Sequence, residues 1–285
     1  MLAFRTERIF ILTALLLVGL GLTLAVSRGA LLGNQEQGTL LVWFMAAILV
    51  FMAGAGARWL RRGVSPSPLT AMPDVRLPLL PIPLDVIVPG ALAAGFVLFL
   101  QFFESGVAQA LIVVLGGLAF AALFWAQAHS LDTRDRFFGL AQSMLNLITY
   151  LTAFLFFCVV YGLKQRAIIS ASAVGVVAAL LIYELLARDA AWHEAMNLPV
   201  EGRRRTLLIL ALVSGLVLAE VMWGLNYWAA LTTLIGGAFL LVVFYVTSGL
   251  TLHYVDRSLT RSVVWEFAAV GALGVLAVFA SAFFS

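Results

Sequence analysis

Long apolar runs dominate this sequence and constrain its fold more than any other feature. A membrane-spanning α-helix needs about 20 consecutive, mostly apolar residues. Nine runs of this kind occur, at residues 9–27, 39–57, 84–103, 107–127, 138–161, 167–187, 206–223, 227–250 and 262–284. We therefore expect an all-α fold, a polytopic transmembrane bundle of about nine spanning helices.

The composition indicates a bilayer rather than water as the main solvent. Of the 285 residues, 63% are hydrophobic and 11% are charged, whereas soluble domains carry roughly a quarter charged residues. The formal net charge of +3 is small, and basic residues on such a chain are typical of a cytoplasmic membrane face rather than of nucleic-acid binding. We expect the lipid bilayer and other membrane subunits as partners, and no nucleic acid.

A stretch rich in proline and arginine interrupts the apolar runs. Seven of the eight prolines fall between Pro66 and Pro89, and proline disfavours helix interiors. We interpret residues 1–62 as the first two helices, 63–83 as a loop on the inner side, and 84–285 as a seven-helix core.

The distribution of Lys and Arg predicts the orientation, because positive loops resist translocation. With a cytoplasmic N-terminus, fourteen of these residues lie on the inner side and three on the outer side, namely Arg28, Lys164 and Arg166. An odd number of helices then places the C-terminus outside. Lys164 and Arg166 are a local exception to the rule.

The core contains a candidate internal repeat. Residues 95–125 match residues 215–245 at an offset of 120 with eight identities in 31 positions, including Gly116 and Gly117 against Gly236 and Gly237. This predicts parallel repeats over 84–161 and 206–285. The alternative is a chance similarity between apolar helices.

The most polar stripe near the predicted midplane lies on the fifth run. Gln142, Asn146 and Thr149 are spaced four and three residues apart, so they share one helix face. Such a face lines a cavity or supplies hydrogen bonds between helices. Glu220, an acid in a spanning run without a basic neighbour in sequence, is expected at the outer mouth of any cavity there.

Other acids are explained by ion pairs at the inner face. Glu184 and Arg188 are four residues apart on one helix, and Glu266 lies close in depth to Arg261. We expect both pairs to be structural.

The three histidines, His129, His193 and His253, are all predicted on the inner side, each near an acid in sequence. Anchoring at the interface is the expected role, and a metal site is the alternative. The paired histidine spacing of a helical metalloprotease, the Gly-x-Ser-x-Gly motif and a phosphate-binding glycine loop are all missing from the sequence. The sequence therefore gives no enzyme signature and implies no particular cofactor.

About 60 residues at the C-terminus contain a series of short motifs: Phe244-Tyr245, Gly249-Leu250, His253-Tyr254, Leu259-Thr260-Arg261 and Val264-Trp265-Glu266-Phe267. In these motifs the chain resembles an uncharacterised family of bacterial multi-pass membrane proteins of unknown function. It implies a bacterial cytoplasmic membrane and no activity. Our leading hypothesis is a non-enzymatic accessory or scaffold subunit; the alternatives are a small-solute or lipid transporter and a membrane-embedded enzyme.

Overall fold

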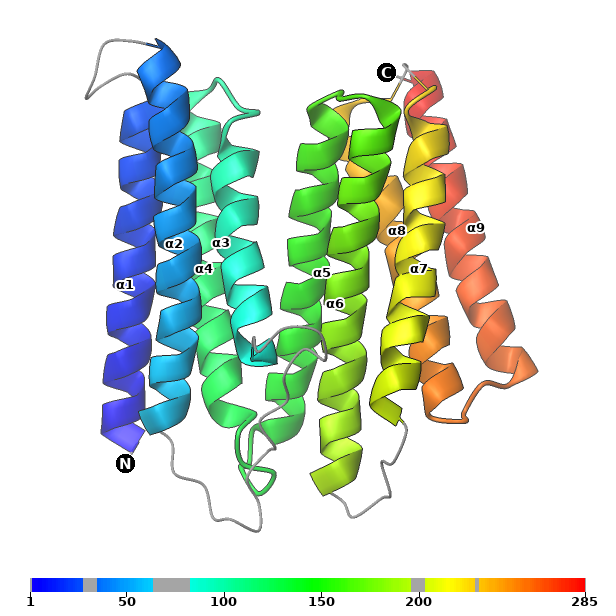
Figure 1. Ribbon diagram of the computed structural model, residues 1–285, viewed down its shortest axis with the longest axis horizontal. Helices are drawn as coiled ribbons and strands as arrows, with labels where there is room; N and C mark the ends of the chain where they lie inside the picture. Colours follow the sequence, from blue (N-terminus) through cyan, green and yellow to red (C-terminus); the bar gives the residue numbers. More distant parts are fainter. Residues whose placement is uncertain (1, 28–34, 64–82, 196–202, 229–230, 285) are drawn as a thin grey trace. The chain divides into compact units, whose positions relative to one another are not determined.

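The computed structural model describes residues 2–27, 35–63, 83–195, 203–228 and 231–284, and these ranges are almost entirely helical (Figure 1). In chain order they form α1 (Leu2–Ser27), α2 (Gln35–Gly63), a short 3-10 helix (Leu84–Val86), α3 (Ile87–Leu100), α4 (Gly106–His129), α5 (Phe138–Gly162), α6 (Ala167–Ala195), α7 (Arg203–Leu225), α8 (Thr233–Val255) and α9 (Arg261–Phe284). Within the described ranges, eight of the nine α-helices are long and apolar enough to cross a membrane. The predicted all-α transmembrane fold is confirmed, while the orientation of its termini stays a prediction.

Several helices are longer than the apolar runs that predicted them. The run at 167–187 becomes α6, which continues to Ala195, and the run at 39–57 becomes α2, which continues to Gly63. A helix does not have to end where the hydrocarbon ends, because its internal hydrogen bonds are equally available at the interface. Nearly all of the predicted loop at 63–83 lies outside the described residues.

The residues up to Thr152 form one compact unit. In this unit α1 packs against α2 and α4, and α2 packs against α3. Gly116 and Gly117 of α4 are buried against α1, where a Cβ on Gly116 would lie 2.9 Å from Cδ1 of Leu20. Phe120 and Phe124 are fully buried and stack with ring centroids 6.3 Å apart. Apolar burial of α4 against α1 thus contributes to the stability of this unit.

The third helix is shorter than its apolar run predicted. After Leu100 the chain turns, with Gln101 N–H donating to the carbonyl of Leu98 at 3.2 Å. The remaining 14 residues of α3 span only about 21 Å at 1.5 Å per residue. At the other end, Arg61 Nη1 lies 3.8 Å from Asp85 Oδ2, and Gln127 Nε2 donates to the carbonyl of Asp85 at 2.9 Å. These polar contacts fix the start of α3 against α2 and α4.

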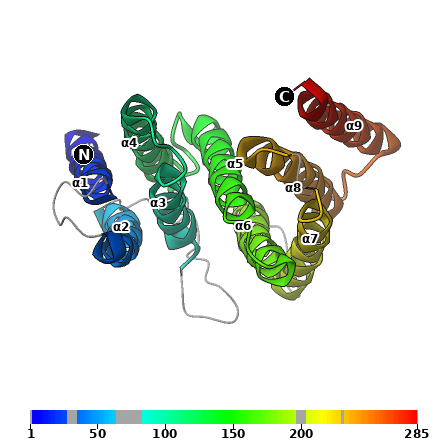
Figure 2. The ribbon, with the colours of Figure 1, turned by 90° about the horizontal axis from the view of Figure 1, so that it is seen from above.

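The second compact unit comprises Ala153–Ser285. Viewed along the helices, α7 lies beside α6 and α8, and α9 lies beside α8 at the edge of the unit (Figure 2). Phe157 of α5 packs on Phe244 of α8 with ring centroids 5.7 Å apart. Most of α9 is exposed, since only 11% of its apolar, potentially membrane-spanning stretch is buried. Such a surface suits lipid rather than water.

The residues aligned by the candidate repeat play similar parts in the two units. Gly236 and Gly237 are buried against Tyr161 and Cys158 of α5, as Gly116 and Gly117 are buried against α1. At the ends of the two glycine-bearing helices, His129 Nδ1 lies 2.8 Å from Asp135, and His253 Nδ1 lies 2.8 Å from Ser258 Oγ. The repeat itself stays a prediction that these parallels support.

Candidate functional site

Small residues let α6 and α7 approach closely in the second unit. A Cβ on Gly215 of α7 would lie 2.8 Å from the Cβ and 3.2 Å from the backbone nitrogen of Ala179 of α6. A Cβ on Gly175 would lie 3.1 Å from the carbonyl oxygen of Gly215. Close backbone contact of this kind is typical of packed membrane helices with glycine and alanine at their crossing.

This crossing leaves a groove of about 580 Å³ between larger side chains. Its floor is formed by the small residues Ala171, Gly175, Ala179, Gly215 and Ala219. Val176 and Leu216, which are 60% and 61% exposed, line it as apolar walls. The groove therefore follows from the sequence, because small side chains at a crossing leave a valley between large ones.

Polar groups gather where α6 begins and α7 ends. Glu220 and Ser172 are exposed and line the groove, as does Trp223, which is 45% exposed. Arg166 is exposed, and its carbonyl accepts hydrogen bonds from the N–H groups of Ile169 and Ser170, so it sits at the start of α6. The groove thus has an apolar body and a charged end.

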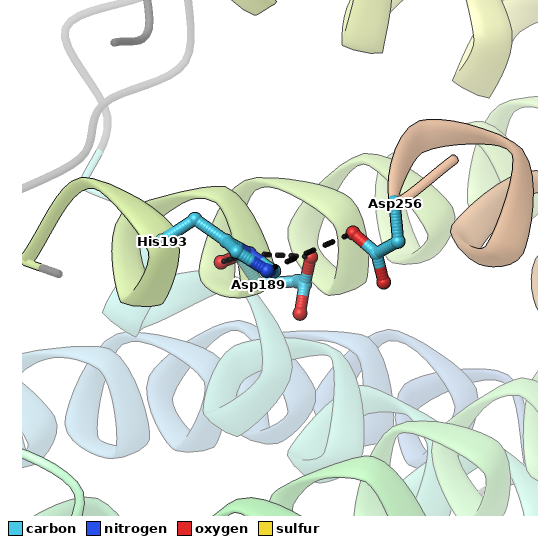
Figure 3. A group of neighbouring side chains, drawn as sticks. All are labelled: Asp189, His193 and Asp256. Carbon is cyan, nitrogen blue, oxygen red and sulfur yellow. Dashed lines mark hydrogen bonds and ion pairs between the residues drawn. The ribbon is translucent and has the colours of Figure 1, made fainter. Parts of the chain in front are cut away.

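A second polar cluster lies where α6 and α8 end (Figure 3). Asp189 and His193 are one turn apart on α6, and Asp256 caps the C-terminus of α8. His193 Nδ1 lies 3.0 Å from the carbonyl oxygen and 3.3 Å from Oδ2 of Asp189, while its Nε2 lies 4.0 Å from Oδ1 of Asp256. One ligand atom from each of the three lies within 4.8 Å of the others. Each ring nitrogen of His193 therefore has an oxygen atom of an aspartate within 4.0 Å.

The three residues of the polar face predicted on α5 differ in how deeply they are buried. Thr149 is buried and its hydroxyl donates to the carbonyl of Leu145 at 2.9 Å, whereas Asn146 is exposed. Gln142 is half-buried, and in the described structure its Nε2 is buried without a hydrogen-bond acceptor. These residues belong to the first unit and Glu220 to the second. Their common cavity stays a prediction.

The two expected ion pairs differ. Arg188 Nη1 lies 3.1 Å from Glu184 Oε1, and the two side chains are 13% and 8% exposed. Glu266 and Arg261 are both exposed, and the described part of the chain contains no ion pair between them. A partner for Glu184 is fixed by helix geometry, but Glu266 and Arg261 are five residues apart and do not share a face as closely.

Among the three histidines, the described residues place two acidic side chains around His193 alone. His129 contacts Asp135 and His253 contacts Ser258. The spacing of Asp189 and His193 is visible in the sequence as an i,i+4 pair. Asp256 could not be found in this way, because only the packing of the second unit brings the end of α8 to α6.

Residues 30–281 match the family described as Protein of unknown function (DUF5656). The chain belongs to this family. The expected resemblance to an uncharacterised family is thereby confirmed, and the DUF5656 match extends well beyond the C-terminal stretch. No curated protein and no solved structure matches the chain. The groove and the Asp189–His193–Asp256 cluster both lie within the DUF5656 region.

Proposed function

We propose that this DUF5656 protein is a non-enzymatic membrane accessory protein that binds a phospholipid, phosphatidylethanolamine, in the groove between α6 and α7. The observation that carries the proposal is the exposed carboxylate of Glu220 at the end of an otherwise apolar groove. An acid on a spanning helix is costly unless it meets water, protein or a cation. An ammonium headgroup supplies that cation from within the membrane.

The body of the groove suits an acyl chain. Its floor of alanine and glycine offers no hydrogen-bonding side chain, and its walls are the apolar Val176, Leu212 and Leu216. Packing a chain into this valley gains dispersion contacts that straight lipid tails do not make with a flat helix surface. The volume of about 580 Å³ falls in the range of about 300–1,000 Å³ that is usual for small-molecule sites.

The charged end of the groove complements a zwitterion. In this proposal Glu220 accepts hydrogen bonds from the ammonium group, and Arg166, two residues before the groove residue Ile168, binds the phosphate. Trp223 suits the headgroup level, where indole rings are enriched. A phosphate bound at the start of α6 would also account for Lys164 and Arg166, the local exception to the positive-inside rule on the predicted outer side. A helix of a partner protein could occupy the groove instead of lipid, but it would need a cation of its own facing Glu220. The experiment below distinguishes these two occupants.

The experiment is lipid retention by the full chain in nanodiscs containing equal amounts of phosphatidylethanolamine and phosphatidylglycerol, followed by native mass spectrometry. We expect the protein to retain phosphatidylethanolamine selectively. Glu220→Gln should lower retention by about tenfold, because it replaces the charged acceptor of a hydrogen bond worth about 1.5–3 kcal/mol with a weaker, neutral one. Glu104→Gln, at an exposed acid of the first unit, is the matched control and should retain the lipid.

A second variant tests the body of the groove. Ser172→Phe places a ring in the groove from an exposed position, and it should expel the acyl chain without disturbing the core. Ser143→Phe, at an exposed serine of α5, is its control. Three outcomes would each overturn the proposal. They are equal retention of both lipids, retention unaffected by Ser172→Phe, and a bound partner protein in place of lipid in the native mass spectra.

A further inference from the structure

We infer that Asp189, His193 and Asp256 form a binding site for a divalent transition-metal ion, which ties the end of α6 to the end of α8. The site is independent of the lipid groove: His193 lies 21 residues along α6 from Ser172, a distance of about 32 Å. The inference rests on the helix ends that meet there, on the orientation of the imidazole, and on the ligand types.

The helix ends make the location attractive to a cation. Asp189 and His193 lie in the last two turns of α6, and Asp256 is the C-cap of α8. The C-terminus of an α-helix carries a partial negative charge of about half an electron. Two such ends and two carboxylates converge on the same imidazole (Figure 3). The local field therefore favours a positive ion.

The imidazole is oriented as a metal ligand. The main-chain carbonyl of Asp189 lies 3.0 Å from His193 Nδ1, so we assign the proton of the neutral ring to Nδ1, which donates to it. The lone pair of Nε2 then points toward Asp256. Histidines that bind metals typically donate their other N–H to a backbone carbonyl or a carboxylate, which fixes the tautomer in this way.

The distances allow coordination after small side-chain adjustments. Nε2 of His193 and Oδ1 of Asp256 are 4.0 Å apart, whereas two ligands bound at about 2.1 Å in tetrahedral geometry are about 3.4 Å apart. The carboxylate of Asp189, whose Oδ2 lies 3.3 Å from Nδ1, completes the group by rotating toward Nε2, since one ligand atom from each of the three residues lies within 4.8 Å of the others. The three side chains are each about one quarter exposed. This leaves a fourth position open for water.

The ligand types select the metal. One imidazole and two carboxylates offer one nitrogen and hard oxygen ligands, a set that binds Zn²⁺ and Mn²⁺. Zn²⁺ stands above Mn²⁺ in the general affinity order. We therefore expect Zn²⁺ to bind more tightly than Mn²⁺. Mg²⁺, which prefers six oxygen ligands, should bind weakly.

An ion pair without metal is the competing explanation. A protonated His193 would be attracted to both aspartates, but at 4.0 Å its Nε2–H would be too far from Asp256 for a hydrogen bond. His129 provides a direct comparison, because its Nδ1 lies 2.8 Å from one aspartate, Asp135. In the described structure it has no second carboxylate ligand grouped with it.

The test uses the full chain, purified without a histidine tag and stripped of metal with a chelator, and titrated with Zn²⁺, Mn²⁺ and Mg²⁺ by calorimetry. We expect one Zn²⁺ per chain. His193→Asn and Asp256→Asn should each weaken Zn²⁺ binding by about 100-fold or more, since changes in supporting residues alone cost 10–100-fold. His129→Asn should leave Zn²⁺ binding unchanged.

A second readout separates loss of binding from loss of folding. At a Zn²⁺ concentration 100 times the dissociation constant, the unfolding midpoint of the wild-type chain should rise by about 5 °C. The His193→Asn variant should unfold cooperatively without responding to Zn²⁺. Failure of the wild-type chain to bind Zn²⁺ or Mn²⁺, undiminished binding by folded His193→Asn, or loss of binding in His129→Asn would overturn the inference.

Discussion

At the scale of single residues, several hydroxyl groups in the spanning helices are satisfied by their own helix. Thr23, Thr149 and Thr152 are buried, and each donates to the carbonyl four residues earlier at 2.8–2.9 Å. A threonine in this state requires neither a partner helix nor a water-filled cavity. The hydroxyl of Thr149 is therefore satisfied within α5 and contributes little to a cavity or to bonding between helices. For the same reason, the sequence of the polar stripe could not decide between these two roles.

The ion pair on α6 gives a prediction at this scale. Glu184→Gln should destabilise the protein by about 1–3 kcal/mol, because it leaves the half-buried guanidinium of Arg188 with a weaker, neutral acceptor. Phosphatidylethanolamine retention should be unaffected. Thermal unfolding in detergent measures the first effect and native mass spectrometry the second. Glu266→Gln, at an exposed acid, is the control and should change stability by less than about 0.5 kcal/mol. Equal losses in both variants would contradict the assignment.

At the scale of helices, glycines set how closely neighbours approach. A Cβ on Gly237 of α8 would lie 3.0 Å from both the Cα and the backbone nitrogen of Cys158, so α5 itself would have to move. At Gly117 of α4 the added Cβ would meet only the side chain of Leu17. A side-chain end can rotate away, but a helix backbone cannot.

We therefore expect Gly237→Ala to cost about 1–3 kcal/mol of stability, and Gly117→Ala to cost less. Gly139→Ala is the control, since a Cβ there has nothing within 4 Å, and it should be neutral or slightly stabilising in a helix. Unfolding of the three variants in one detergent ranks them. A Gly117→Ala variant less stable than Gly237→Ala would contradict this account of α5 and α8.

The helices themselves were predictable, because the bilayer dictates the length and apolar character of a spanning segment. The ends of the helices were less predictable. The apolar run that predicted α6 ends at residue 187, whereas the helix continues to Ala195. That extension carries Asp189 and His193. The groove between α6 and α7 was also missed, because hydropathy treats glycine and alanine at a crossing like any other apolar residues.

At the scale of the whole molecule, the predicted orientation can be tested directly. The fourteen-to-three bias of Lys and Arg places the N-terminus inside, and an odd number of spans places the C-terminus outside. Reporter fusions after Ser285 and within residues 63–80 should therefore report opposite sides of the membrane. Reporters on the same side would show that one of the seven helices from α3 to α9 does not cross, and α3, with 14 residues, would be the first to suspect.

The shortness of α3 also bears on the surrounding lipid. Its length of about 21 Å falls short of a hydrocarbon thickness of about 30 Å, and Asp85 with its arginine partner stands just before its first turn. Hydrophobic mismatch thins a bilayer where a short helix faces lipid, but most residues of α3 are buried against neighbouring helices. The longer α2 and α4, which pack against α3 and are long enough to span, therefore meet the lipid in its place, and the short helix should cost no more in thick, sterol-rich membranes than in thin ones.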